Sequence, residues 1–211
     1  MRTRQEIKAI GKERFLANYW NCVLALLLIG LAIGLASSFT VGIGALILAG
    51  PLTIGLNHFF ILNIFGRPEA NTVGTPFTAA FRNFSRKLGG YLWMVLFTFL
   101  WSLLFYIPGI IKGFSYAMTP YILADCPNVR AKDALKLSMR IMNGHKWELF
   151  VFYLSYLGWL ILSAFTWGLL EIFYVGPYMY SSLAVYYLEV REDALRRGVI
   201  TMDQLNGLEP V

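Results

Sequence analysis

Six apolar runs dominate the chain, separated from one another by threonine, glycine, proline or charged segments. They cover residues 20–39, 41–65, 88–107, 110–124, 147–167 and 169–188. A helix needs about 20 apolar residues to cross a hydrocarbon core roughly 30 Å thick. The pattern therefore predicts an all-α fold, in which residues 1–211 form one membrane domain: a polytopic helix bundle with about six transmembrane helices.

Two of these runs are irregular. The fourth is the shortest and carries Lys112 near its start and Pro120 near its end. With a rise of about 1.5 Å per residue, it barely crosses the hydrocarbon core, so it either spans the membrane or forms a re-entrant hairpin. In the second run, Gly50-Pro51 predicts a kink or a short break, which a membrane helix tolerates when neighbouring helices cover the freed carbonyl.

Composition agrees with a membrane protein. The chain has 57% hydrophobic and 14% charged residues, with a mean hydropathy of +0.58. A soluble domain carries roughly 25% charged residues. The apolar content excludes a disordered chain, and the presence of only two cysteines, Cys22 and Cys126, excludes a disulfide scaffold.

The basic residues predict the orientation. Of the 18 lysines and arginines, 17 lie in segment 1–19, in the loops after the second and fourth runs, or at the C-terminal end, and Lys112 lies on the other side. An excess of lysine and arginine marks the cytoplasmic side. We therefore predict a multi-pass protein of the plasma membrane with cytoplasmic termini and a cytoplasmic tail over residues 191–211. Anionic lipid headgroups are the expected partner of these charges, and nucleic acid is not expected.

The connecting segments carry their own helical pattern. Residues 75–88 and 128–142 have apolar side chains at helical spacing, and segment 1–19 is a basic amphipathic segment. Each is expected to form a cytoplasmic amphipathic helix, a type that lies well in the headgroup plane. These helices either pack under the bundle and against lipid or dock a cytoplasmic protein partner.

The three pairs of runs resemble one another, which suggests a pseudo-repeat of three hairpins. Each follows a basic segment and an aromatic boundary, and the first and third share Gly50-Pro51 and Gly176-Pro177. The middle pair departs from this spacing. Repeats of this kind are common in transporters, but they also arise in inert membrane proteins.

Ionisable and polar residues in or beside the runs are the candidate site residues. Lys112 either snorkels to the outer interface or lines a pathway, where Glu171 could pair with it. His58 with Asn57 and Asn63 is suited to interhelical hydrogen bonding or, alternatively, to proton handling. The sequence has no catalytic motif, phosphate loop or metal-ligand spacing, so we expect no enzymatic activity, no cofactor and no metal.

A long motif string adds a resemblance. It consists of Pro108, Gly109, Lys112, Pro120, Tyr121, Asp125, Gly144, His145, Lys146, Trp147, Pro177 and Tyr178. It resembles the bacterial integral membrane protein family catalogued as domain-of-unknown-function family 975. Residues 1–20 also resemble the basic segment with which that family begins. The resemblance implies a multi-span bacterial membrane protein without an established activity, so no catalytic residue is carried over.

Two functions remain open from the sequence. The first is a non-enzymatic bundle in the envelope that interacts with lipid or with a partner protein. The alternative is a small-solute or ion transporter or channel with Lys112, Glu171 or His58 in its pathway.

Overall fold

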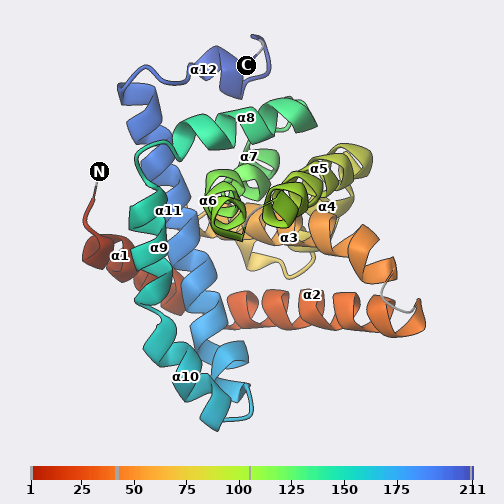
Figure 1. Cartoon of the computed structure of the whole chain (residues 1–211). Helices are drawn as coiled ribbons and strands as arrows, with labels where there is room; N and C mark the ends of the chain where they lie inside the picture. The colour runs from red at the N-terminus through yellow and green to blue at the C-terminus, as the bar shows by residue number, and fades with distance from the viewer. Residues whose placement is uncertain (1, 41–42, 105, 210) are drawn as a thin grey trace.

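Figure 1 shows the computed structural model of the chain, which describes residues 2–40, 43–104, 106–209 and 211. The described residues form helices and contain no strand, which confirms the all-α prediction. Among them, three helical stretches are long and apolar enough to cross a membrane: Tyr19–Phe39, Gly44–Ile64 and Lys146–Phe165. This is half of the number of spans that the sequence predicts.

The first part of the chain is an amphipathic helix followed by a hairpin: α1 (Arg4–Ala17), α2 (Tyr19–Phe39) and α3 (Ile43–Ile64). Thr3 and Glu6 form a capping box, in which each side chain accepts a hydrogen bond from the other residue's backbone N–H and so fixes the start of α1. Pro51 lies inside α3, which continues through it, so the break that Gly50-Pro51 suggested does not occur. Residues 41 and 42 of the predicted second run lie outside the described residues.

The second part comprises η1 (Pro68–Asn71), α4 (Thr75–Phe81), α5 (Phe84–Leu104), α6 (Tyr106–Tyr116) and α7 (Thr119–Asp125). The prediction of one helix over residues 75–88 is wrong, because Asn83 adopts a left-handed backbone with φ 54° and separates α4 from α5. The run at 110–124 is likewise two helices. Pro120 lies in the first turn of α7, where its missing N–H removes no helical hydrogen bond. Residue 105 of the predicted third run lies outside the described residues.

The third part comprises α8 (Ala131–Ile141), α9 (Lys146–Leu154), α10 (Leu157–Phe165), the π-helix η2 (Glu171–Val175), α11 (Gly176–Arg196) and α12 (Met202–Leu205). The fifth predicted run is divided between α9 and α10. Helix α11 continues well past residue 188, where the sixth run ends, so the first residues of the predicted tail are helical. Glutamate and arginine are good helix formers, and α1 packs along α11 and supports this extension.

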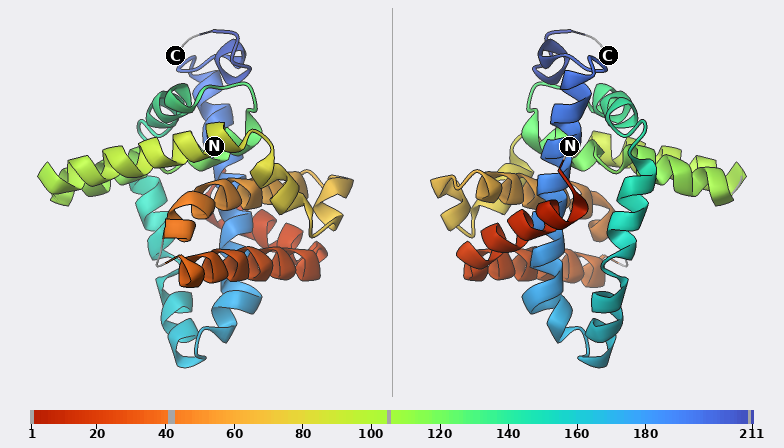
Figure 2. Two further views of the ribbon diagram at one scale, coloured as in Figure 1. Left: turned by 90° about the vertical axis from the view of Figure 1, so that its right-hand side faces the viewer. Right: turned by 90° about the vertical axis from the view of Figure 1, so that its left-hand side faces the viewer.

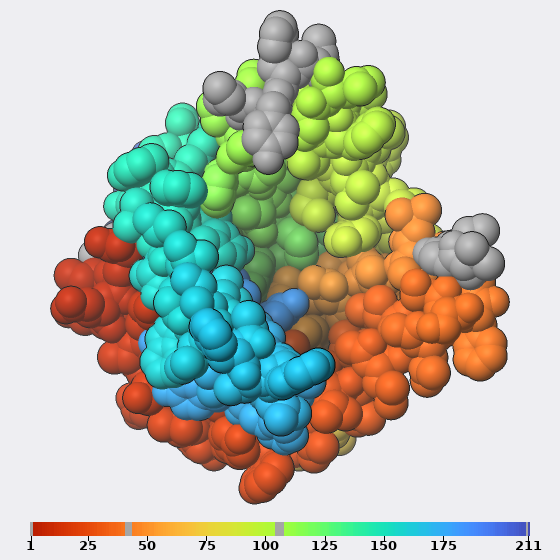
Figure 3. Space-filling view, turned by 60° about the horizontal axis from the view of Figure 1, so that its bottom comes forward, coloured from red at the N-terminus to blue at the C-terminus, as the bar shows by residue number. Residues whose placement is uncertain are grey.

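The helices form three hairpins that point in different directions. Hairpin α2–α3, hairpin α5–α6, and the hairpin of α9 and α10 with α11 extend away from a common base (Figures 1 and 2). Figure 3 looks onto the face with the three tips, which form separate lobes around a hollow. We call the three hairpins the arms.

The amphipathic helices close the base. Helix α1, which precedes α2, packs against α11. Helix α4, which precedes α5, packs against α3, and helix α8, which precedes α9, packs against α7. Glycine permits two of these close approaches. A Cβ added at Gly55 would lie 2.1 Å from the Pro76 carbonyl oxygen, and one added at Gly11 would lie 2.5 Å from Ser182 Oγ.

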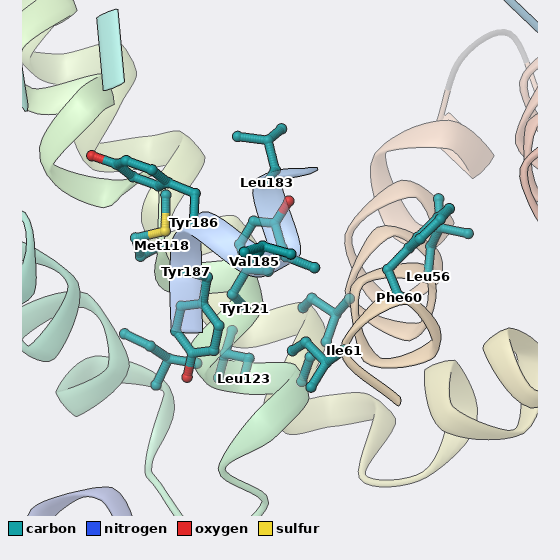
Figure 4. Packing of buried hydrophobic residues seen from close by; sticks show 14 of the residues in the cluster. Leu56, Phe60, Ile61, Met118, Tyr121, Leu123, Leu183, Val185, Tyr186 and Tyr187 are labelled. Carbon is teal, nitrogen blue, oxygen red and sulfur yellow. The ribbon is translucent and has the colours of Figure 1, made fainter. Parts of the chain in front are cut away.

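The buried core lies in this base. Figure 4 shows Tyr121 of α7 beside Tyr187 of α11, and their rings stack with centroids 5.5 Å apart. The ends of the arms differ, because their large apolar side chains are exposed: Phe39 by 85%, Leu103 by 73% and Phe165 by 80%. Apolar surface on this scale marks a contact with membrane or protein.

Candidate functional site

Glu171 occupies an apolar cleft between α2 and the start of α11. It is the first residue of the π-helix, a distortion that is frequent at functional sites. Its carboxylate accepts a hydrogen bond from Ser163 Oγ at 3.4 Å. The cleft has a volume of about 370 Å³, and its other lining residues include Leu26, Leu27, Gly30, Leu31, Ile172 and Tyr180. A carboxylate therefore lies within apolar surroundings on one of the arms.

Lys112 lies on a different arm from Glu171. Its Nζ is 5.0 Å from the centroid of the Trp101 ring, so α6 contacts α5 through a cation–π interaction. No ion pair joins Lys112 to Glu171 among the residues that the structure describes. Each of the two charged side chains contacts its own hairpin instead.

The polar patch of α3 divides into separate interhelical contacts. His58 Nδ1 lies 3.0 Å from the Ala124 carbonyl oxygen, so its Nδ1–H tautomer donates a hydrogen bond from α3 to α7. Asn63 Nδ2 donates to the Arg14 carbonyl oxygen at 3.1 Å. Asn57 is 2% exposed, and its Oδ1 has no hydrogen-bond partner within the described part of the chain. His58 and Asn63 thus link α3 to α7 and α1 through hydrogen bonds.

Asp125, at the end of α7, binds two residues of α11. Its Oδ2 accepts a hydrogen bond from Tyr187 OH at 2.9 Å and forms an ion pair with Arg191 Nη1. Tyr121, one turn before Asp125, stacks on the Tyr187 ring. The sequence singled out Tyr121 and Asp125 but not their partners. The spacing of four residues between Tyr187 and Arg191, which places both on one helical face, was the available signal.

A second polar cluster anchors α9 to α11. His145 Nδ1 lies 2.9 Å from Glu148 Oε2, and its Nε2 lies 3.1 Å from Asp193 Oδ2, which also binds Arg197 Nε at 2.7 Å. Burial alone would raise the pKa of Asp193, but the hydrogen bond from His145 and the charge of Arg197 lower it overall. In the described residues, no group of three or more His, Cys, Asp and Glu side chains could hold a metal ion.

Arg86 and Lys87 fasten the start of α5. The Arg86 guanidinium donates to the carbonyl oxygens of Leu123, Cys126 and Val129 at 2.7, 3.1 and 2.7 Å, and so satisfies carbonyl groups at and beyond the end of α7. Lys87 is 5% exposed, and its ammonium group donates to the Ala79 carbonyl oxygen. Burial and, secondarily, the Arg86 charge lower the pKa of Lys87 to about 8. In the sequence, both residues served only to predict which side of the membrane their loop occupies.

The other motif positions lie at turns and packing contacts. A Cβ added at Gly109 would lie 2.4 Å from Ser102 Oγ, so Gly109 lets α6 approach α5 closely. Tyr178 packs on Tyr156 with centroids 5.3 Å apart. Gly144 has a φ of 91°, in the left-handed region that favours glycine. Pro108 and Pro177 lie in the first turns of α6 and α11, Lys146 begins α9, and Trp147 is exposed beside it.

A groove between α5 and α8 combines apolar walls with ammonium groups. Its volume is about 330 Å³, and its walls include Trp93, Phe97, Tyr116 and Leu135. Lys132 and Lys136 of α8 also line it. Neither lysine was a candidate site residue in the sequence, although their spacing of four residues could have placed them on one face of the predicted helix. We call this feature the α5–α8 groove.

Residues 103–194 match the model of a family described as "Protein of unknown function (DUF975)". The matched segment contains the whole motif string that runs from Pro108 to Tyr178, and the match confirms the resemblance over that segment. No curated protein and no solved structure matches the chain.

Proposed function

We propose that this chain, whose residues 103–194 match that family of unknown function, is a six-span protein of the plasma membrane with cytoplasmic termini. In the membrane, the three arms, which diverge from the base in the structure, align with the bilayer normal so that each crosses the bilayer twice, and the base lies at the cytoplasmic surface. The protein acts as a non-enzymatic bundle that interacts with membrane lipid.

The distribution of charge carries this proposal. Within residues 20–65, 88–124 and 149–188, the charged residues are Lys112 and Glu171. The arms expose leucine, isoleucine and phenylalanine instead, whereas the other basic residues belong to the base and its flanking segments. A protein with apolar arms and a basic base fits a membrane in which the arms lie in the bilayer and the base faces the cytosol.

The helix lengths support six spans beyond the three stretches already identified. Helix α5 begins in the base with Arg86 and Lys87, and its apolar part, residues 88–104, is about 26 Å long at about 1.5 Å per residue, close to the thickness of the hydrocarbon core. It exposes Leu96, Phe99 and Leu100 along its outer face. Helix α6 is too short to return alone, and α7 completes the return to the base. The π-helix η2 and α11 together return from the third tip.

Helix α8 supports lipid as the partner. It exposes Lys132, Lys136 and Arg140 at intervals of four residues, which places a row of basic groups on one face. Each basic group near an anionic membrane surface contributes about 1 kcal/mol of attraction. The opposite face of α8 is buried in the base, so this row is directed outward.

Two measurements test the proposal. Protein purified in mild detergent is analysed by mass spectrometry for co-purifying lipid, and anionic phospholipid is expected to be enriched over its share of the host membrane. The same protein in liposomes is assayed for flux of a panel of small solutes and ions, and no flux above empty liposomes is expected. Unselective lipid retention together with substrate-specific flux would contradict the proposal.

The alternative, a small-solute or ion transporter, is favoured by the carboxylate of Glu171 in its apolar cleft. Ionisable residues at membrane depth often mark transport pathways. A flux that Glu171→Gln abolishes and Lys112→Ala leaves unchanged would assign the pathway to this cleft. His58 is a weaker candidate for proton handling, because its Nδ1 is engaged with the Ala124 carbonyl oxygen.

A further inference from the structure

The α5–α8 groove contains an acyl-chain surface and a headgroup surface side by side. Trp93 and Phe97 of α5 are one helical turn apart and line one wall, with Tyr116 of α6 and Leu135 of α8 beside them. Phe97 is 37% exposed, so the apolar wall is not covered by another helix. A hydrocarbon chain that lay along this wall would remove apolar surface from contact with water or disordered lipid.

The ammonium groups lie at one side of this apolar wall. Lys132 Nζ is 5.2 Å from the centroid of the Trp93 ring, and Lys136 lies one turn further along the same face of α8. The neighbouring carboxylate, Asp133, is bound by Arg130 Nε at 2.7 Å and lies 4.0 Å from Lys136 Nζ. Lys136 Nζ also donates to the Val211 carbonyl oxygen at 2.8 Å. Lys132 has no carboxylate partner among the described residues, so the groove keeps a positive charge.

The groove lies at the depth where phospholipid headgroups meet hydrocarbon. Trp93 follows the start of the third apolar run by five residues, and tryptophan prefers the membrane–water interface. Phe97 then lies one turn deeper, and α8 lies at the cytoplasmic surface. This placement depends on the proposed orientation in the membrane.

We propose that the α5–α8 groove is a binding site for one anionic phospholipid of the cytoplasmic leaflet. The phosphate group lies between the ammonium groups of Lys132 and Lys136, and an acyl chain lies against Trp93 and Phe97. A free phosphate ion would match the ammonium groups but would leave the apolar wall uncovered. The combination of both surfaces therefore selects a lipid.

The two lysines set the expected affinity. A basic group at an anionic surface contributes a factor of about five, so loss of both charges weakens binding about 25-fold. Arginine at both positions keeps the charge and retains binding. The matched control replaces Lys12 and Arg82, which are exposed basic residues of the base outside the groove, and removes the same total charge.

The experiment uses the full chain in nanodiscs of phosphatidylcholine that contain a minor fraction of either brominated phosphatidylglycerol or brominated phosphatidylcholine. Bromine quenches tryptophan fluorescence at short range, and the difference between the wild type and Trp93→Phe isolates the signal of Trp93. Brominated phosphatidylglycerol is expected to quench this signal more strongly. The excess quenching disappears in Lys132→Gln/Lys136→Gln and persists in Lys12→Gln/Arg82→Gln.

Equal quenching of Trp93 by the two brominated lipids would overturn the site while leaving the membrane placement intact. An excess quenching by brominated phosphatidylglycerol that is undiminished in Lys132→Gln/Lys136→Gln would do the same. Displacement of the effect by millimolar inorganic phosphate would also overturn it in favour of a simple anion site. A wild-type chain that fails to insert into nanodiscs would instead overturn the proposed function on which this inference depends.

Discussion

Substitution of Gly55 tests the packing that closes the base. A Cβ at this position would lie 2.1 Å from the Pro76 carbonyl oxygen and 2.9 Å from the Ala80 backbone nitrogen. Both are backbone atoms of α4, so rotation of a side chain cannot relieve the contact. Helix α4 would have to move away from α3, and overpacking of this kind costs about 1–3 kcal/mol.

A second glycine provides the reference for this measurement. Gly34, on α2, has no atom within 4 Å of an added Cβ. Replacement of a helical glycine by alanine gains up to about 1 kcal/mol of helix stability. Gly34→Ala should therefore be neutral or stabilising, and Gly55→Ala should be destabilised relative to it by about 1–3 kcal/mol. The difference between the two variants isolates the steric cost at the α3–α4 contact.

The assay is reversible unfolding in mixed micelles by titration with sodium dodecyl sulfate, followed by tryptophan fluorescence. The midpoint for Gly55→Ala is expected at a lower detergent fraction than those for the wild type and Gly34→Ala. Equal midpoints for the two alanine variants would refute the close approach of α4 to α3, and with it the closure of the base by α4.

Three further predictions concern buried side chains of the base. Arg191→Leu leaves the mostly buried Asp125 carboxylate without its ion-pair partner, and a loss of about 1–3 kcal/mol is expected in the same titration; stability equal to the wild type would contradict this role. Lys87 has a folded-state pKa of about 8 against an ordinary value of 10.5, so the unfolded chain binds more protons between these values and stability should rise with pH across that window. Lys87→Met should remove this rise, and a slope that persists in the variant would assign it to another group. Burial and, secondarily, the Asp125 charge raise the pKa of Cys126 to about 12, so a maleimide should label this thiol at neutral pH after unfolding but not before.

The sequence was sufficient for the helical class and for features that depend on local pattern. The run at 20–39 gives α2 over Tyr19–Phe39, because uninterrupted apolar residues specify such a helix. The spacing Thr201-x-x-Gln204 is typical of a capping box, and one forms at the start of α12. The pairs Asn143-Gly144 and Asn206-Gly207 are typical of helix ends, and both glycines follow a helix with positive φ.

Features that depend on tertiary contacts were not accessible from pattern alone. The apolar stripe of residues 75–88 is consistent with one helix, but the packing of α4 against α3 requires the chain to turn at Asn83. Arg86 and Arg191 indicated only orientation in the sequence, because their partners lie about 40 and 66 residues away. The α5–α8 groove likewise joins helices from separate segments of the chain.

Labelling of single cysteines with a membrane-impermeant thiol reagent in intact cells tests the six-span placement most directly. The chosen positions are exposed: Thr78 and Arg140 in the base, and Thr40 and Trp167 at two tips. Thr40→Cys and Trp167→Cys are expected to react from outside, whereas Thr78→Cys and Arg140→Cys should react only after the cells are permeabilised. Labelling of either base position in intact cells would contradict the cytoplasmic placement of the base.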